Sequence, residues 1–266
     1  MASSIRKLKN FAHLLFAAGS NIAYGFPSKG MTIIGVTGTD GKTTTSCLIA
    51  HILEIAGEKV ALISTIGANI DGKMYETGYH TTTPSYFHIQ KFLKIARDKN
   101  CKYAVMEVTS HALDQNRVFG VKFDIGVLTN ITNEHLNYHE NYENYVYTKL
   151  KLLRNSKVAI VNSTGDWLAY IQKELPNSKM KTYSLDGNLE NDVSQNTLPF
   201  KIKTKLLGDF NKENIIAAST ACLTLGVDPK VIDRAVASFD PPKGRQQIIE
   251  NSKIGMIMID FAHTPN

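Results

Sequence analysis

Cysteine, long apolar runs and sequence repeats are scarce or absent in this chain of 266 residues. Its three cysteines, Cys47, Cys101 and Cys222, are odd in number, far apart and set in apolar surroundings. This spacing disfavours disulfides and a cysteine metal cluster, and it predicts buried thiols in a reducing compartment. No stretch approaches the roughly 18 apolar residues of a membrane-spanning helix. We therefore expect a cytoplasmic globular protein.

The charge of the chain is basic but is not concentrated in one region. The formal net charge is +6, and the lysine and arginine residues are scattered along the sequence. Nucleic-acid-binding proteins usually cluster their lysine and arginine residues, so we expect no nucleic-acid partner. The scattered charge is more compatible with small anionic substrates. With 43% hydrophobic and 20% charged residues, the chain can bury a full core.

Residues 1–30 are predicted to form a short helical segment of their own. Apolar residues recur there at helical spacing, at Ile5, Leu8, Phe11 and Leu15. This pattern favours a helix that docks its apolar face on the rest of the protein. A helix lying on a membrane surface is the less favoured alternative, in which Arg6, Lys7 and Lys9 would meet anionic lipid.

Short apolar runs alternate with helical patterns after residue 30, which is typical of an α/β fold with a mostly parallel sheet and helices on both faces. Buried strands are predicted at 31–37, 59–65, 102–108, 124–130 and 157–162. Helices are predicted at 44–57, 85–100, 212–226 and 229–239. Residues 184–204 are polar and weakly patterned, so we expect loops and short edge strands there. The pattern at 253–262 predicts a strand followed directly by the last residues of the chain.

A glycine-rich loop joins the first predicted strand to the first helix. Gly38, Gly41 and Lys42 belong to the stretch GTDGKT, which follows a β-rich run and opens a helix. Glycines let backbone amides turn toward a phosphate, Lys42 can reach β- and γ-phosphates, and Thr43 can ligate magnesium. The strict phosphate-loop spacing fails at Val36, where its first glycine belongs. An ordinary strand-to-helix turn is therefore the alternative.

The stretch GVTGTDGKTTT at 35–45 resembles the ATP loop of the Mur ligases, which add amino acids to the UDP-N-acetylmuramoyl-peptide precursor of peptidoglycan. Further blocks resemble that family in its own order: HTTTP at 80–84, MEVTSHALDQNRV at 106–118, TNITNEHLNYH at 129–139, YTKLKLL at 147–153, GDFNKENIIAA at 208–218, KGR at 243–245 and DFAHTPN at 260–266. The EVTSH and HLNYH blocks are most similar to the branch that adds diaminopimelate or lysine as the third residue. Folylpolyglutamate synthetases usually carry GKGS where this chain has GKTT.

The resemblance implies an ATP-dependent amide-bond ligase that adds the third amino acid to UDP-N-acetylmuramoyl-L-Ala-D-Glu through an acyl phosphate, with release of ADP and phosphate. The expected partners are the UDP-N-acetylmuramoyl-peptide and an amino acid, and the expected state is a monomer. Two alternatives are another amide ligase of the superfamily, such as a cyanophycin or folylpolyglutamate synthetase, and a nucleotide-binding module without ligase activity.

The family motifs also imply binding residues. ATP is expected on Gly38, Thr39, Asp40, Gly41, Lys42, Thr43, Thr44, Asn214, Arg245 and Asp260. Among these, Asn214 would meet the adenine, Arg245 the phosphates and Asp260 the ribose, and His263 is a further candidate. Contacts to the muramoyl peptide are expected from Thr81, Thr82, Thr83, Ser110, Gln115 and Arg117. Thr81 departs from the asparagine that is common at its position.

The resemblance implies a catalytic set as well: Lys42, Glu107, His135 and Lys149. Two magnesium ions are expected on Thr43, Glu107, His135 and Lys149. Lys149 matches a lysine that the family carbamylates, which turns a cation into an anionic ligand; a solvated helix lysine beside Lys151 is the alternative. His135 and His139 are four residues apart, but no third ligand supports zinc, so His139 is expected to help position its loop.

Three segments are expected from these patterns: a helical segment at 1–30, the central ATP-binding domain at 31–247, and the start of a C-terminal ligase domain at 248–266. Complete Mur ligases have three domains, and about thirty residues are too few for the first of them. We therefore interpret the chain as a piece of a longer ligase with a shortened N-terminal domain. In a naturally short protein, a partner would have to supply the missing half.

Overall fold

The computed structural model describes residues 2–77, 82–132, 134, 136–251 and 255–260. An eight-stranded sheet runs through it in the order β4-β3-β2-β5-β1-β6-β7-β8. Its strands are β1 (Thr32–Thr37), β2 (Val60–Ser64), β3 (Gly67–Ile70), β4 (Lys73–Tyr75), β5 (Tyr103–Glu107), β6 (Phe123–Leu128), β7 (Ser156–Asn162) and β8 (Met180–Tyr183). From β2 to β8 all neighbours are parallel, whereas β3 and β4 pair antiparallel at one edge. The predicted mostly parallel sheet is confirmed.

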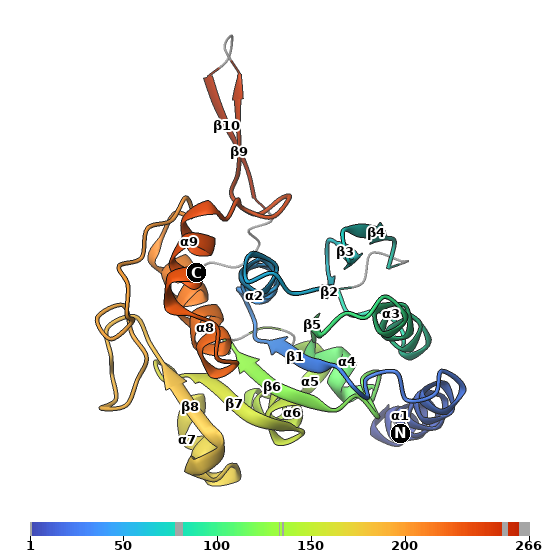
Figure 1. The fold of residues 1–266 in the computed structure, drawn as a ribbon. Coiled ribbons are helices and arrows are strands. Elements are labelled where there is room, and N and C mark those ends of the chain that lie inside the picture. The colour runs from blue at the N-terminus through green and yellow to red at the C-terminus, as the bar shows by residue number, and fades with distance from the viewer. Residues whose placement is uncertain (1, 78–81, 133, 135, 252–254, 261–266) are drawn as a thin grey trace.

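Helices cover both faces of this sheet (Figure 1). One face carries α2 (Lys42–Ile55), α8 (Asp209–Thr224) and α9 (Pro229–Ser238). The other carries α3 (Tyr86–Asp98), α4 (Ser110–Asp114), α6 (Tyr142–Arg154) and α7 (Trp167–Glu174). At the periphery, α1 (Ala2–Ala23) packs beside α3, the short α5 (Leu136–His139) beside α6, and a 3-10 turn, η1 (Asn177–Lys179), precedes β8. The predicted doubly covered α/β architecture is therefore correct.

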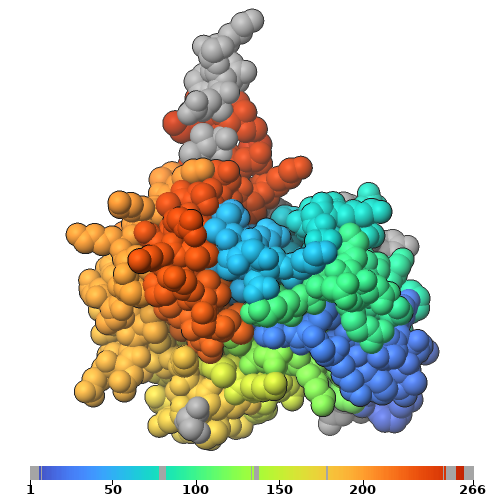
Figure 2. Space-filling model, viewed as in Figure 1, coloured from blue at the N-terminus to red at the C-terminus, as the bar shows by residue number. Residues whose placement is uncertain are grey.

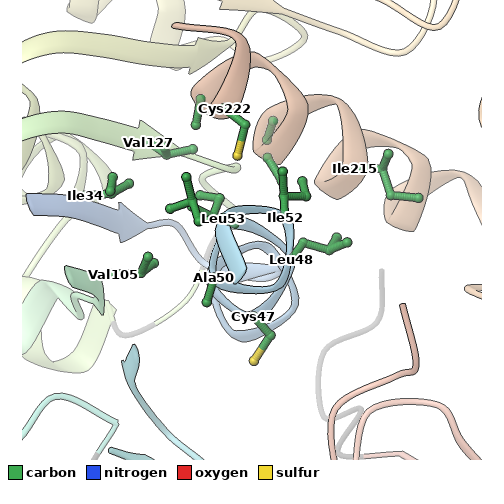
Figure 3. Close-up of a cluster of buried hydrophobic side chains, with 14 of the residues drawn as sticks. Ile34, Cys47, Leu48, Ala50, Ile52, Leu53, Val105, Val127, Ile215 and Cys222 are labelled. Carbon is green, nitrogen blue, oxygen red and sulfur yellow. The ribbon is translucent and has the colours of Figure 1, made fainter. Parts of the chain in front are cut away.

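The core forms where alternate strand residues meet the helices. Ile34 of β1 lies in one buried cluster with Leu48 and Ile52 of α2 (Figure 3). Ile33, its neighbour in the chain, belongs to the cluster on the α3 side. Successive strand residues point to opposite faces, and burial of both faces makes the strands near-continuous apolar runs. All three cysteines are free and buried, as predicted.

A hairpin of β9 (Gln247–Asn251) and β10 (Gly255–Ile259) stands away from the main sheet (Figure 1). The predicted strand at 253–262 is present as β10, and residues 261 and 262 lie outside the described part of the chain. Residues 184–204 form no helix or longer strand and contribute a single bridge, between Tyr183 and Val193. Among the described residues, no helix is both long enough and apolar enough to cross a membrane.

The N-terminal helix α1 docks on the domain with the opposite face from the one expected. Leu8, Phe11 and Leu15 are 71%, 57% and 57% exposed. The inward face is polar: Arg6 Nε and Asn10 Nδ2 donate hydrogen bonds to Asp114 Oδ2, at 3.2 and 3.0 Å. A buried carboxylate needs donors to replace its hydration, and apolar side chains supply none. The prediction that the apolar face docks is therefore wrong.

Candidate functional site

A cavity of about 430 Å³ opens where the carboxyl ends of three neighbouring strands meet. β1 lies between β5 and β6. After β1 the chain forms β2 to β5 on one side of it, and from β6 onward it forms the strands on the other side. Open α/β sheets bind their ligands at such a crossover point. The loop after β1, Glu107 at the end of β5, and Thr129 and Asn130 after β6 all line the cavity. Distant parts of the sequence thus converge at one edge.

The loop between β1 and α2 depends on glycine at two close contacts. A Cβ on Gly38 would collide with the Thr129 side chain, and one on Gly41, whose φ is 77°, would collide with Asn214. The loop begins only at Gly38, because Val36 is still a fully buried β1 residue, so the missing first glycine of the strict motif is not needed here. The first N–H groups of α2 have no helical carbonyl partner and form an anion-binding end beside the cavity.

Asn130, which the sequence analysis did not select, fixes the conformation of this loop. Its Oδ1 accepts hydrogen bonds from the backbone N–H groups of Thr39, at 3.1 Å, and Asp40, at 2.8 Å. The signal that could have found it is its position directly after β6, at the same sheet edge as the loop.

Two lysines meet at the carbonyl oxygen of Gly38. Lys42 Nζ donates to it at 3.1 Å and to Thr39 O at 2.7 Å, and Lys149 Nζ donates to it at 2.6 Å. Lys149 is 1% exposed and lies 4.4 Å from the centre of the Tyr145 ring. Its burial, and then the charge of Lys42, lower the pKa of Lys149 well below the usual value. The alternative of a solvated helix lysine is therefore wrong.

Glu107 is held by two threonines from different elements. Thr43 Oγ1 donates to both carboxylate oxygens, at 3.0 Å to Oε1 and 3.1 Å to Oε2. Thr65, just after β2, donates its N–H at 3.0 Å and its hydroxyl at 2.9 Å to Oε2. Oε2 is thus fixed by Thr65, while Oε1 is directed toward Thr43. The sequence analysis missed Thr65, although β2 neighbours β5 and ends at the same edge.

Another part of the cavity lining combines apolar and amide groups. Leu206, Phe210 and Tyr183 line it. The amide of Asn214 is fixed on both sides, because Oδ1 accepts from Thr45 Oγ1 at 3.2 Å and Nδ2 donates to Asn211 Oδ1 at 3.2 Å. Arg245 and Asp260, both expected from the sequence, also line the cavity. An apolar surface with a fixed amide suits a heteroaromatic base.

Three of the residues expected to contact the muramoyl peptide, Thr83, Gln115 and Arg117, form one hydrogen-bonded group beside Glu107. Thr83 Oγ1 donates to Glu107 O at 3.0 Å, and Thr83 O accepts from Arg117 Nη1 at 2.9 Å. Arg117 Nε donates to Gln115 Oε1 at 2.9 Å. Thr82 lines the cavity itself. Burial lowers the pKa of Arg117, which marks it as a partly desolvated cation able to pair with an anion.

Ser110, another of these residues, is hydrogen-bonded to His139. His139 Nε2 and Ser110 Oγ are 3.0 Å apart, and the imidazole is fully buried. Burial, and then the nearby His111, lower the pKa of His139 to about 4, so the ring is neutral at neutral pH. Among the described residues, no three histidine, cysteine or acidic side chains gather as a metal site. His135, Thr81 and His263 lie outside the described residues.

Asp114 connects α1 to this group. Besides Arg6 and Asn10, Tyr138 Oη donates to Asp114 Oδ2 at 2.9 Å, and Gln115 Nε2 donates to Tyr138 Oη at 3.4 Å. Burial raises the pKa of Asp114, but the hydrogen bonds from Arg6, Asn10 and Tyr138 outweigh it and leave that pKa below its usual value. No sequence pattern indicates these links, because they join residues that are 23 to 108 positions apart and that only the fold brings together.

Replacing Asp114 with asparagine is expected to destabilise the fold by about 1–3 kcal/mol at neutral pH, since charged hydrogen bonds are weakened. A lowered folded-state pKa means that the contribution of Asp114 is present above its unfolded pKa of about 3.9 and is lost as pH falls through the folded value. The difference between the two proteins in urea unfolding should therefore shrink in that acidic range. Asp240→Asn, which loses only the exposed pair with Lys205, should change stability by less than about 1 kcal/mol.

The fold and the cavity define an α/β domain with a phosphate-binding loop at a sheet crossover. The family model for the Mur ligase middle domain matches residues 36–222, so the chain belongs to the Mur ligase family. The resemblance inferred from the motifs is thereby confirmed.

Named relatives and solved structures agree with this assignment. A UDP-N-acetylmuramoyl-L-alanyl-D-glutamate--2,6-diaminopimelate ligase of Clostridium tetani is 36% identical over 277 residues, covering 98% of this chain and 56% of that protein. A solved structure of a ligase with the same name superposes with a TM-score of 0.74 at 32% identity, over 89% of this chain and 52% of that one. The apo form of L. casei FPGS, at 19% identity and a TM-score of 0.74 over 94% of this chain and 72% of that one, shares the fold. The chain spans about half the length of the curated relatives it matches.

Proposed function

We propose that the chain supplies the ATP-binding centre of a ligase that adds the third amino acid, diaminopimelate or lysine, to UDP-N-acetylmuramoyl-L-Ala-D-Glu. The single observation that carries this proposal is the convergence of the phosphate loop, Glu107 and the buried Lys149 beside Arg117 and its partners. The relatives named for this reaction support the choice of substrate. The reaction would take place in the cytoplasm, and the ligase would act as a monomer.

The first task of such a site is to hold two anions together, the triphosphate and the substrate carboxylate. The N-terminal amides of α2 and the Lys42 ammonium would bind the β- and γ-phosphates. Lys42 now donates to Gly38 O and Thr39 O, so it would exchange these two carbonyls for phosphate oxygens. Fixed positive charge then offsets the repulsion between the carboxylate and the triphosphate. The carboxylate oxygen attacks the γ-phosphorus, an acyl phosphate forms and ADP leaves.

The oxygen atoms around Thr43 fit magnesium, a hard cation that prefers carboxylate, hydroxyl and phosphate oxygens. We propose Thr43, Glu107 and His135 as protein ligands, with Lys149 as a further ligand after carbamylation, for two ions in all. Bound magnesium would neutralise part of the phosphate charge. Lys149 fits carbamylation because a fully buried amine at the phosphate loop favours its neutral form, which is the form that reacts with carbon dioxide.

The remaining residues would bind the peptide and the nucleoside. Thr81, Thr82, Thr83, Ser110, Gln115 and Arg117 are proposed for the muramoyl peptide, with Arg117 gripping an anionic oxygen pair. Asn214 would meet the adenine, Arg245 the phosphates and Asp260 the ribose, with Gly38, Thr39, Asp40, Gly41 and Thr44 completing the phosphate cradle. His139 would position Ser110 rather than bind metal. In this proposal 31–247 is the central ATP-binding domain, 248–266 begins the ligase C-terminal domain, and 1–30 is a separate segment.

Ligand binding by calorimetry tests the proposed substrate. In the presence of magnesium and a non-hydrolysable ATP analogue, we expect the chain to bind UDP-N-acetylmuramoyl-L-Ala-D-Glu more tightly than UDP-N-acetylmuramoyl-L-Ala, which lacks the reacting glutamate. Arg117→Ala should remove most of this preference. Binding of a reduced folate in place of both muramoyl compounds would instead identify a folylpolyglutamate synthetase-like site, and the proposal would be wrong.

Replacing Thr65 with valine is expected to weaken magnesium binding about tenfold, because the hydroxyl that fixes Glu107 Oε2 is lost. Manganese, which is paramagnetic, allows the affinity to be measured by electron paramagnetic resonance in the presence of the ATP analogue. Thr65→Ser keeps a hydroxyl at the same position and should retain the affinity. Equal manganese affinity in the valine variant and the original protein would show that Thr65 does not position Glu107.

A further inference from the structure

The N-terminal helix α1 is amphipathic, but it turns its apolar face to the outside of the molecule. By the spacing of about 100° per residue, Leu8, Phe11, Leu15 and Ile22 fall on one stripe. These four side chains are 71%, 57%, 57% and 65% exposed. Phe16 lies about 80° outside the stripe; it is 60% exposed, and its ring stacks on that of Tyr86 at the start of α3, with 5.9 Å between the ring centres. Surface helices normally turn such a stripe toward the core.

The face that α1 turns inward is polar and specifically bonded, so the orientation is set by the fold. Arg6 and Asn10 donate to Asp114, and Asn10 O accepts from Asn116 Nδ2 at 3.1 Å. The small Ala17, fully buried, lies on the same inward side. Rotating the helix to bury its apolar stripe would break these hydrogen bonds and leave the Asp114 carboxylate without the donors that Arg6 and Asn10 supply. The apolar stripe therefore stays at the surface, where α1 forms the outer edge of the molecule (Figure 2, dark blue).

The charged residues of the segment itself have one sign, and of these Arg6 is paired with Asp114 and Glu140. The first 39 residues contain no aspartate or glutamate, whereas they contain Arg6, Lys7, Lys9 and Lys29. By helical spacing, position 7 lies at one border of the stripe, whereas position 9 lies about 100° beyond Leu8, on the flank of the helix. Lys9 is exposed, and the Lys29 ammonium lies 4.5 Å from the centre of the half-exposed Phe26 ring beyond the end of α1. A second copy of the chain docked on this face would bring its own cations against these, which disfavours a dimer.

We propose that the exposed face of α1 lies on an anionic lipid bilayer, with Leu8, Phe11, Leu15 and Ile22 in the acyl boundary and the exposed Lys9 and Lys29 at the head groups. An exposed apolar stripe in a segment whose charged residues are all basic is the pattern of an interfacial helix, and Phe26 with Lys29 extends it past Ala23. The helix lies in the plane of the surface, in accord with the absence of a spanning helix among the described residues. Because the opposite face of α1 bonds Asp114, the surface would hold the cavity-bearing domain at a fixed orientation.

Vesicle flotation of the full chain tests this surface. The probes are vesicles of phosphatidylcholine alone and of phosphatidylcholine mixed with phosphatidylglycerol. We expect binding to the mixed vesicles only, with a decrease as salt is raised. The variant Phe11→Glu/Leu15→Glu should reduce the bound fraction about tenfold or more, whereas Phe11→Leu should retain it. Met74→Glu is the matched control, because Met74 on β4 is also 57% exposed but lies outside α1, and it should bind as the original chain does.

The outcomes separate the lipid from other occupants and from unfolding. Binding of an ATP analogue by the double variant shows that its domain is folded, since neither residue lies at the cavity. Absence of binding to the mixed vesicles at low salt, equal binding to both vesicles, or equal loss in Met74→Glu would overturn the proposal. So would a dimer by light scattering that the double variant abolishes, because the second copy would then be the occupant. None of these results bears on the ligase reaction proposed above.

Discussion

Replacing Lys42 with alanine should reduce ATP-dependent phosphate release by about 10²–10³-fold, the usual cost of removing one preorganised positive group from a phosphoryl-transfer site. Lys42 Nζ lies between Gly38 O and Thr39 O, where phosphate oxygens are expected to enter, and no other ammonium among the described residues of the loop itself can take its place. Binding of the ATP analogue to the chain should weaken as well. Both effects are measurable, by a phosphate-release assay with the muramoyl dipeptide and by calorimetry.

Two further variants distinguish the position of Lys42 from the charge of the chain. Lys203→Ala also removes one positive charge, but Lys203 is exposed and does not line the cavity; it should leave analogue binding unchanged. Lys42→Arg keeps the charge on a planar group that does not replace the compact ammonium, so most of the loss should persist. Full phosphate release or analogue binding by Lys42→Ala would refute the assignment of the phosphate loop.

The sheet was predictable because its strands are buried on both faces. β1, β5, β6 and β7 each coincide with a predicted apolar run, and in a parallel sheet such runs carry most of the signal. The hairpin of β3 and β4 was not predicted, since strands of three and four residues leave too short a pattern. The strand β9 was missed because its sequence, QIIEN, has only two apolar residues and forms no apolar run. The orientation of α1 was predicted wrongly because its apolar periodicity is clear, while the opposing requirement comes from Asp114, which only the fold brings within reach of Arg6.

The residues of the candidate site were also predictable only in part. Lys42, Thr43 and Glu107 could be chosen because each has a motif around it, and the structure brings them to one cavity. Thr65 acts through two hydrogen bonds to Glu107, and Asn130 through two from the backbone of Thr39 and Asp40. An isolated threonine or asparagine after a strand has no distinguishing sequence pattern. The burial of Lys149 was equally hidden, because its spacing on α6 beside Lys151 resembles a solvated lysine pair. Only the packing of α6 under the phosphate loop distinguishes the two.

Lys149 gives the second large effect. Lys149→Ala should reduce phosphate release about 10²-fold or more, because the anionic ligand proposed at this position would be lost. The deleted side chain leaves a buried space next to Gly38 O, so acetate or another short carboxylate should restore part of the activity. The matched variant is Lys151→Ala, two positions along the same helix, whose side chain is 42% exposed; it should need no such rescue.

The carbamate itself can be detected independently of turnover. In the original protein and in Lys151→Ala, ¹³C-bicarbonate should produce a carbamate carbon resonance that Lys149→Ala lacks. Burial lowers the pKa of Lys149 and so favours the unprotonated amine, which is the form that attacks carbon dioxide. Lowering the pH should remove the resonance, because the carbamate then decomposes to carbon dioxide and the protonated amine. If the resonance is absent and acetate rescues nothing, Lys149 acts through its amine alone, as the donor that holds Gly38 O in place.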